Sequence, residues 1–357
     1  MSETQEDLDN LAAYDYSLSR ELIAQQPTDQ RIDARLMVVE RKTGTISHHH
    51  VRDLPEFFNA GDALVLNTSK VIPARLVGVR TSSGGRWEGL FLRHNEEGLW
   101  ESLSHTRGHL TPGETVTLRD REGRQCEALT IVSRLPNGHM VIRPTEPESF
   151  ESFLERFGRV PIPPYIRDGQ MVDQDVERYQ TVYAREAGSV AAPTAGLHFT
   201  ADLLKRIQER GVIRAPVVLH VGLGTFRPIQ ATNLATHAMH SEQAELTEAV
   251  AKRLISCRMD GGRVVAVGTT SARVLETACS RNAGKLAAWS GETDIFIRPP
   301  YEFKAVDGLM TNFHLPKSTL LVMVAALAGL ELVKQAYAEA IAQRYRFYSY
   351  GDAMLIV

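Results

Sequence analysis

Seven short β-rich runs follow one another between about residue 61 and residue 144, with no helical periodicity between them. Glycine-containing turns, spelled SSGG, EEG, TPG, REG and PNG, separate the runs. Short strands at this spacing are typical of a small β-barrel or β-sandwich. We therefore predict an inserted all-β barrel domain over residues 61–144. Its expected strands are residues 63–66, 74–79, 86–92, 99–103, 114–118, 125–132 and 139–142.

On either side of this insert, strand-like runs alternate with helical ones. Residues 263–267, for example, run into a glycine-containing loop that leads on to a helix. This order is typical of an α/β layer with a largely parallel sheet. We therefore predict that residues 14–60 and 145–357 form one discontinuous α/β catalytic domain, preceded by a flexible tail over residues 1–13. The other expected elements are helices at 20–26, 148–157, 200–210, 247–260, 272–282 and most of 318–346, and strands at 34–39, 217–221 and 295–297.

Length, composition and charge limit the classes of protein that this chain can be. A length of 357 residues favours two domains, and 43% apolar with 23% charged residues describe a folded chain. The formal net charge is −3, so binding of a polyanion requires a local basic surface. Three cysteines without CxxC spacing, an acidic N-terminus and no apolar run longer than residues 320–330 predict a cytoplasmic protein without a membrane span.

Three loops are rich in glycine and hydroxyl-bearing residues. They are AAPTAGLHFT at residues 191–200, HVGLGTFRP at residues 220–228 and VGTTSAR at residues 267–273. Because ligands of open α/β sheets collect at the carboxyl ends of strands, these loops are the candidate site. In the first loop, Gly196 permits a positive φ, and Thr200 is expected to cap the helix that follows.

The third loop predicts an anion site. A strand ends in glycine, three hydroxyl-bearing residues follow and a helix begins, so free N–H groups and the helix dipole favour a carboxylate or phosphate. A simpler alternative is that Thr270 or Ser271 only caps the helix. The second loop lacks the third glycine and the acidic residue of a dinucleotide fingerprint, which argues against a Rossmann-type enzyme.

Histidines are the candidate proton-transfer groups, since imidazole titrates near neutral pH. His198, His220 and His314 each lie in or beside a polar loop. The run of residues 48–50 and the His237-x-x-His240 spacing, which suits a helix, lack further ligands nearby, so we predict no metal site.

Two segments near the carboxyl terminus, MTNFHL and YRFYSYGDA, mix aromatic with polar residues. Aromatic rings in such loops stack on nucleobases, although core packing explains Phe313 and Phe347 as well. Asn312 and Asp352 are harder to explain by packing alone, so we include both among the candidate site residues.

Several long motifs carry a resemblance to a known family. AAPTAGLHFT, LHVGLGTFRP, MHSE, VGTTSARVLE, TNFHLPKSTL and YRFYSYGDAM occur in this order, with NTSKVIPARL and PIPPYI upstream. From about residue 14 to its end, the chain therefore resembles the S-adenosylmethionine:tRNA ribosyltransferase-isomerases of the queuosine pathway.

The resemblance implies an activity. The ribosyl group of S-adenosylmethionine would move to the aminomethyl group of 7-aminomethyl-7-deazaguanine at the tRNA wobble position, giving epoxyqueuosine, adenine and methionine. S-adenosylmethionine would be consumed as a substrate, and no separate cofactor is expected. The expected partner is tRNA that carries this precursor, and the protein is expected to be a monomer.

The resemblance also implies roles for particular residues. His198 or His220 would be the base. The glycine loop at residues 222–225 would hold adenosine, and Thr269, Thr270 and Arg273 would hold the methionine end. Alternatively, the basic residues of the barrel belong to a solvated face. The catalytic candidates are His198, His220, His314 and Asp352; those for substrate binding are Thr194, Gly222, Gly224, Thr225, Thr269, Thr270, Arg273, Asn312 and Phe313; those for tRNA are Lys70, Arg75 and Arg80.

The chain departs from the family pattern at Thr68, Gln243, Arg298 and Pro300. Three other functions compete with the one implied. A non-catalytic RNA-binding module would release no adenine, a metal-dependent hydrolase would contain metal and respond to chelators, and a methyltransferase would produce S-adenosylhomocysteine.

Overall fold

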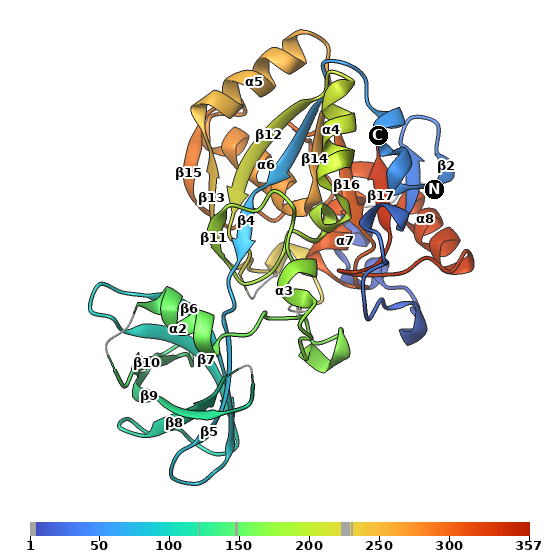
Figure 1. Cartoon of the computed structure of the whole chain (residues 1–357). Coiled ribbons are helices and arrows are strands. Elements are labelled where there is room, and N and C mark those ends of the chain that lie inside the picture. The colour runs from blue at the N-terminus through green and yellow to red at the C-terminus, as the bar shows by residue number, and fades with distance from the viewer. Residues whose placement is uncertain (1–4, 121, 147–148, 223–228, 230) are drawn as a thin grey trace. The chain divides into compact units, whose positions relative to one another are not determined.

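The computed structural model describes residues 5–120, 122–146, 149–222, 229 and 231–357. The chain separates into two compact units, each with its own sheet (Figure 1). Unit 1 comprises Met1–Lys70, Pro164–Asp168 and Glu177–Val357, and unit 2 comprises Val71–Pro163 and Gly169–Val176.

Unit 1 is built on a nine-stranded mixed sheet. Its order is β15 (Trp289–Thr293), β13 (Glu242–Leu246), β12 (Ile213–Leu219), β3 (Ala63–Asn67), β14 (Val264–Val267), β16 (Gly308–Asn312), β17 (Ala353–Ile356), β1 (Arg35–Glu40) and β2 (Thr45–His50). The central strands β12, β3, β14 and β16 are mutually parallel, as are β17 and β1. The remaining neighbours are antiparallel, so the predicted parallel sheet is confirmed only in part.

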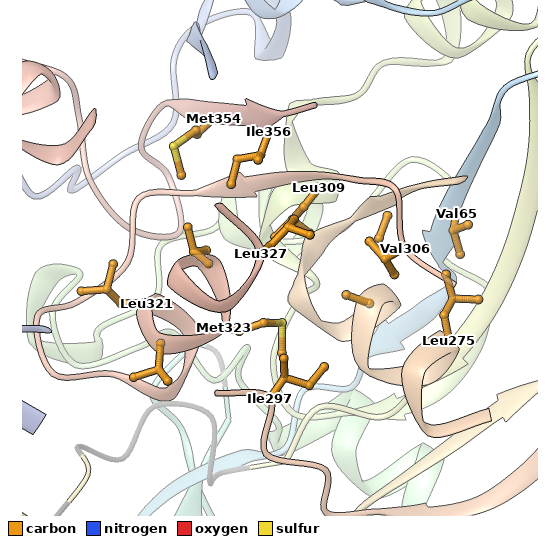
Figure 2. Close-up of a cluster of buried hydrophobic side chains, with 14 of the residues drawn as sticks. Val65, Leu275, Ile297, Val306, Leu309, Leu321, Met323, Leu327, Met354 and Ile356 are labelled. Atoms are coloured by element: carbon orange, nitrogen blue, oxygen red, sulfur yellow. The ribbon is translucent and has the colours of Figure 1, made fainter. Parts of the chain in front are cut away.

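Alternate residues of the central strands face two different cores, which is why these strands are largely apolar. In β3, Ala63 and Val65 belong to one core, and Leu64 and Leu66 belong to the other. The first core is covered by α5 (Glu248–Met259), α6 (Gly268–Arg281), α7 (Thr319–Ala328) and α8 (Leu330–Ala342). Figure 2 shows side chains of β3, β16 and β17 meeting those of α6 and α7 in this core.

The second core lies under α4 (Ala201–Glu209) and the 3₁₀ segments η4 (Val51–Phe57) and η6 (Thr194–His198). The Thr200 side chain caps α4 by accepting a hydrogen bond from the Leu203 N–H at 3.1 Å, as expected. The smaller elements are α1 (Gln5–Asp9), α2 (Phe150–Phe157), α3 (Asp175–Arg178), η1 (Leu11–Tyr14), η2 (Arg20–Leu22), η3 (Arg31–Asp33), η5 (Arg167–Gly169), η8 (Leu234–Thr236), and the paired strands β4 (Ser69–Val71) and β11 (Glu186–Ser189).

Unit 2 is a closed six-stranded antiparallel barrel. Around the barrel the strands are β10 (Met140–Pro144), β7 (Trp100–Thr106), β6 (Arg86–His94), β5 (Arg75–Arg80), β8 (Thr115–Arg119) and β9 (Gln125–Arg134). Buried side chains alternate with exposed ones along β6, and Trp87 is fully enclosed. The predicted inserted barrel is therefore confirmed as an architecture, but its predicted first strand is wrong, because residues 63–66 lie in β3 of the large sheet.

Two further predicted elements are wrong. Residues 295–297 form no strand, since the edge strand β15 lies just upstream of them. Residues 20–26 form only the short segment η2, because Ile23 is extended and bridges to Phe347. In both places a long-range contact decides the backbone conformation, which local sequence does not encode.

The apolar run at residues 320–330 lies mostly in α7, whose residues 321–325 are buried, as predicted. Within the part of the chain that the structure describes, no single helix is long and apolar enough to cross a membrane. Taken as a pair, α7 and α8 pass that test by length and composition only, and they are bent by 115°.

Candidate active site at the carboxyl ends of the central strands

A pocket opens in unit 1 where neighbouring parallel strands reach their carboxyl ends. Strand β12 leads to Val221, β14 to residues 268–270 and β16 to residues 311–315, and all of these line the pocket. Residues 192–195 and 348–349 complete its walls. The parallel direction of the central strands brings these segments to one edge of the sheet.

Helix α6 begins at the pocket without a side-chain cap. Its N-cap residue is Val267, and Gly268 takes a φ of +83°, which favours glycine. Ser271 does not cap the helix, because its hydroxyl donates to the Val267 carbonyl at 2.8 Å. The Thr270 hydroxyl is buried without a partner among the described residues. The simpler expectation that one of these two hydroxyls only caps the helix is therefore wrong, and the first N–H groups of α6 are left for a ligand.

Asn312, at the end of β16, is held in one orientation. Its Nδ2 donates to the Tyr348 carbonyl at 3.1 Å and lies 3.3 Å from His198 Nε2. Because a carbonyl only accepts, the Tyr348 contact fixes which end of the amide is the nitrogen. Asn312 Oδ1 is then a buried acceptor without a partner in the described structure. Since Asn312 lines the pocket, this oxygen is suited to accept a hydrogen bond from a ligand.

His198 lies behind Asn312 and does not itself line the pocket. Burial, and then the positive charges of Arg31 and Arg346, lower the pKa of His198 to about 4. The ring is therefore neutral at pH 7, and its Nε2 accepts the second Asn312 N–H. His198 acts on the pocket through this amide.

Of the other two histidines, only His314 lines the pocket. Its Nε2 lies 2.7 Å from the Thr311 hydroxyl, its backbone N–H donates to the Tyr337 hydroxyl at 2.9 Å, and burial lowers the pKa of the ring to about 3. His220 packs against Gly188 of β11, one residue before pocket-lining Val221. Burial lowers the pKa of His220, against the opposing charge of Glu186.

The buried neutral state of His198 and His314 makes stability depend on pH. Their pKa values are about 4 and about 3 in the folded protein, against 6.5 for an unperturbed histidine. Between these values the unfolded chain binds protons that the folded protein does not, so stability is complete above pH 6.5 and falls as the pH falls towards 4. We expect the His198→Gln/His314→Gln double variant to lose less free energy of unfolding over this range than the unsubstituted protein, by on the order of 1–3 kcal/mol. Urea unfolding at pH 7, 5.5 and 4.5 measures this, and parallel pH dependences would contradict it.

Arg273 is held in a buried ion pair with Glu242. Its Nη1 donates to Glu242 Oε2, and Glu242 Oε1 accepts from the Gly222 N–H at 2.8 Å. Arg273 follows Thr270 and Thr269 by three and four residues in α6 but is not among the described residues that line the pocket, so its role at the methionine end stays a prediction. Gly222 itself is positioned through Glu242, whereas Gly224 and Thr225 lie outside the described residues.

Asp352 is not among the residues that line the pocket either. Its carboxylate accepts from the backbone N–H groups of Arg35 and Arg346 at 2.9 and 2.8 Å, and from the Arg35 guanidinium at 3.3 Å. The side chain is 3% exposed. With these bonds Asp352 ties β1 to the turn that precedes β17, which is a structural role.

We expect Asp352→Asn to lower the free energy of unfolding by about 2–3 kcal/mol, below the 3–5 kcal/mol typical of a fully buried pair because Arg35 is partly exposed. Activity per folded molecule should stay close to that of the unsubstituted protein. Urea unfolding and turnover on the same samples separate the two effects. A large loss of kcat with unchanged stability would restore Asp352 to the site.

The first loop is fixed by close packing rather than by a positive φ. Gly196 is not among the residues with positive φ, which corrects that expectation. A Cβ at Gly196 would lie 2.2 Å from the Tyr183 hydroxyl, so only glycine fits. Upstream, the Ser189 hydroxyl accepts from the Val221 N–H at 2.9 Å and donates to the Ala191 carbonyl. These contacts hold the first loop against the end of β12.

Two aromatic residues of the pocket were not predicted. Tyr165 comes from the PIPPYI motif, and its hydroxyl lies 2.7 Å from that of Ser349. Its ring meets the Tyr348 ring edge-on at 4.8 Å, and Tyr348 takes a positive φ of 70°. Such a backbone is costly for a tyrosine and is found mainly at functional sites. The only sequence signal was the presence of both residues in family motifs.

The remaining predicted residues divide clearly. Thr194 and Phe313 both line the pocket. The Phe313 ring is fully buried among Tyr337, Tyr345 and Phe347, which agrees with the alternative that it is a core residue. In the barrel, Arg75 pairs with Glu88 and Arg80 pairs with Glu114, so their charges are used inside unit 2. Lys70 is exposed on β4.

None of the four positions that depart from the family pattern lines the pocket. The Thr68 hydroxyl donates to the Val217 carbonyl, Gln243 bonds Glu292, Arg298 pairs with Asp9, and the Pro299–Pro300 bond is cis. His237 and His240 lie beyond η8 rather than on a helix, which corrects their expected setting. Among the described residues, no three His, Cys, Asp or Glu side chains gather as a metal site would require.

Comparison with known proteins gives a consistent result. Residues 11–356 match the family described as queuosine biosynthesis protein. The chain is 50% identical over 347 residues to a protein of Symbiobacterium thermophilum, covering 97% of this chain and 99% of that one. It is 49% identical over 348 residues to a protein of Pelotomaculum thermopropionicum, covering 98% and 100%. Both relatives are named S-adenosylmethionine:tRNA ribosyltransferase-isomerase.

A solved structure is also similar. It is the crystal structure of S-adenosylmethionine tRNA ribosyltransferase from Thermotoga maritima, at 36% identity and a TM-score of 0.55. The match covers 97% of this chain and 100% of that one.

Proposed function

This chain belongs to the queuosine biosynthesis protein family and acts as a tRNA ribosyltransferase-isomerase, and we propose that its donor is S-adenosylmethionine. The acceptor is the aminomethyl group of 7-aminomethyl-7-deazaguanine at the wobble position of a tRNA. The products are epoxyqueuosine in the tRNA, free adenine and methionine, whose sulfur leaves as a neutral thioether.

One observation carries the proposal: a single pocket beside the carboxyl ends of parallel strands gathers segments of six family motifs, with two buried polar atoms that have no partner among the described residues. These atoms are the Thr270 hydroxyl and Asn312 Oδ1. A nucleoside that carries an amino acid has matching groups at both ends, namely a carboxylate and ribose hydroxyls.

The start of α6 is the binding site for the methionine carboxylate. Its free N–H groups and dipole attract an anion, and the Thr269 and Thr270 hydroxyls add donors. Asn312 Oδ1 accepts a hydrogen bond from a ribose hydroxyl, and His198 is a positioning residue that fixes the amide. A nucleobase in the pocket meets the paired rings of Tyr165 and Tyr348.

The reaction requires removal of a C5′ proton next to the sulfonium. Of the three predicted histidines, His314 is the one that lines the pocket, and burial keeps its ring neutral. We assign this step to His314, with the Thr311 hydroxyl orienting its ring.

The test is incubation of the protein with S-adenosylmethionine and tRNA that carries the precursor. Free adenine and epoxyqueuosine in the digested RNA are expected in equal amounts. S-adenosylhomocysteine in place of adenine would identify a methyltransferase, and the absence of both would contradict the proposal.

A further inference from the structure

Three arginines that no motif singled out line one groove of unit 1. Arg214 lies on β12, Arg253 on α5, and Arg185 on the segment before β11. The end of α4 forms another wall, and Figure 1 shows α4 beside β12. Among the described residues that line the groove there is no aspartate or glutamate. The groove is therefore a concentrated positive surface on a chain whose net charge is −3.

The charges of this groove are not used inside the protein. The guanidinium groups of Arg214 and Arg253 make no hydrogen bond or ion pair within the described part of the chain. Arg185 has one contact, with Glu186 at 3.9 Å, and both side chains are largely exposed. An exposed pair at that distance contributes little. All three guanidinium groups remain available to an external anion.

The predicted tRNA contacts in the barrel differ in this respect. Arg75 and Arg80 each pair with a carboxylate and also donate to backbone carbonyls within unit 2. A guanidinium whose donors are already used must break those bonds to hold a phosphate. The groove arginines have no such bonds to break, and the planar guanidinium group can donate to two phosphate oxygens at once.

A wall made by Tyr183 and the first loop separates the groove from the active-site pocket. Tyr183 lines the groove, and its hydroxyl packs against Gly196 of η6. Two residues earlier in the same segment, Thr194 lines the pocket. A nucleic acid with one nucleotide in the pocket has neighbouring phosphates that can pass over this wall.

We propose that the groove formed by Arg185, Arg214 and Arg253 binds the phosphate backbone of the tRNA substrate. The inference rests on the proposed function, because it takes the RNA acceptor as the occupant. Phosphate contacts of this kind fix the position of an RNA without reading its sequence. They also make affinity depend on salt, because counterions are released on binding.

The experiment compares the Arg214→Gln/Arg253→Gln variant with a matched control, Arg281→Gln/Lys285→Gln, which removes two exposed charges elsewhere in unit 1. Affinity for precursor-bearing tRNA is measured by fluorescence anisotropy between 50 and 200 mM salt, on the order of the range used to define such slopes. The groove variant should bind about tenfold more weakly, and its slope of log Kd against log salt should fall by about 1–2. KM for S-adenosylmethionine should not change.

Affinity and salt slope equal to those of the control would overturn the inference. So would a groove that binds only small anions, seen as stabilisation of the unsubstituted protein by inorganic phosphate with no change in the variant's tRNA affinity. Adenine release by the unsubstituted protein is measured separately. If adenine is released but the groove variant binds tRNA normally, the groove assignment alone fails; if tRNA binds but no adenine appears, the proposed function fails.

Discussion

Replacing Asn312 with leucine is expected to lower kcat/KM for S-adenosylmethionine by about 100- to 1,000-fold, the usual cost of losing one preorganised polar group of an active site. Leucine has nearly the same shape, so the pocket should keep its walls. The substitution removes Oδ1, which has no partner within the described structure and which we assign to the ribose, together with the Nδ2 donor to the Tyr348 carbonyl and His198. Steady-state rates of adenine release measure the effect, and affinity for tRNA serves as the control for folding.

Two substitutions of His198 complete this test. His198→Gln keeps a side-chain acceptor for the Asn312 amide, whereas His198→Leu removes it. If His198 only positions Asn312, glutamine should restore most of the activity that leucine loses, and the pH profile of kcat should not change. Equal and severe losses in both variants would instead make His198 the base.

Glu242→Ala is expected to have the largest effect on stability, a loss of about 3–5 kcal/mol in the free energy of unfolding. Glu242 and Arg273 are both about 95% buried, with exposed fractions of 5% and 4%. Removing the carboxylate leaves a charged guanidinium without its counterion in the interior, and it also removes the acceptor for the Gly222 N–H. Urea unfolding at pH 7 measures the change.

Two controls show whether the uncompensated charge causes this loss. The Glu242→Leu/Arg273→Met variant removes both charges and should recover most of the stability, because an apolar pair of similar volume can replace a buried ion pair. Glu248→Ala breaks an exposed pair with Lys252 and should cost less than about 1 kcal/mol. A Glu242→Ala variant no less stable than Glu248→Ala would contradict the prediction.

The architecture was predictable where local pattern is enough. Alternating burial in β6 and the turns around it were visible in the sequence, and so was the capped helix α4. Strand β3 was assigned to the wrong sheet because ALVLN is apolar throughout and borders the barrel strands along the chain. Its pairing with β12 and β14 is what places β3 in the large sheet. Pairing between segments that are far apart in the chain cannot be predicted from the sequence of one segment alone.

The sequence was enough to predict which loops form the candidate site, but not what each residue does there. Residues of all three loops line one pocket, and two of these loops follow β12 and β14, parallel strands that end on one edge of the sheet. The partners of Arg273 and Asp352 could not be predicted, since Glu242 and Arg35 come from distant parts of the chain. Titration near neutral pH suggested His198 as a base, but His198 lies behind Asn312 and does not line the pocket.

A crystal structure of this protein with S-adenosylmethionine bound tests the central claim most directly. We expect the methionine carboxylate at the start of α6, beside Thr269 and Thr270, and a ribose hydroxyl within hydrogen-bonding distance of Asn312 Oδ1. S-adenosylmethionine bound outside this pocket, or bound in it with its carboxylate turned away from α6, would contradict the claim.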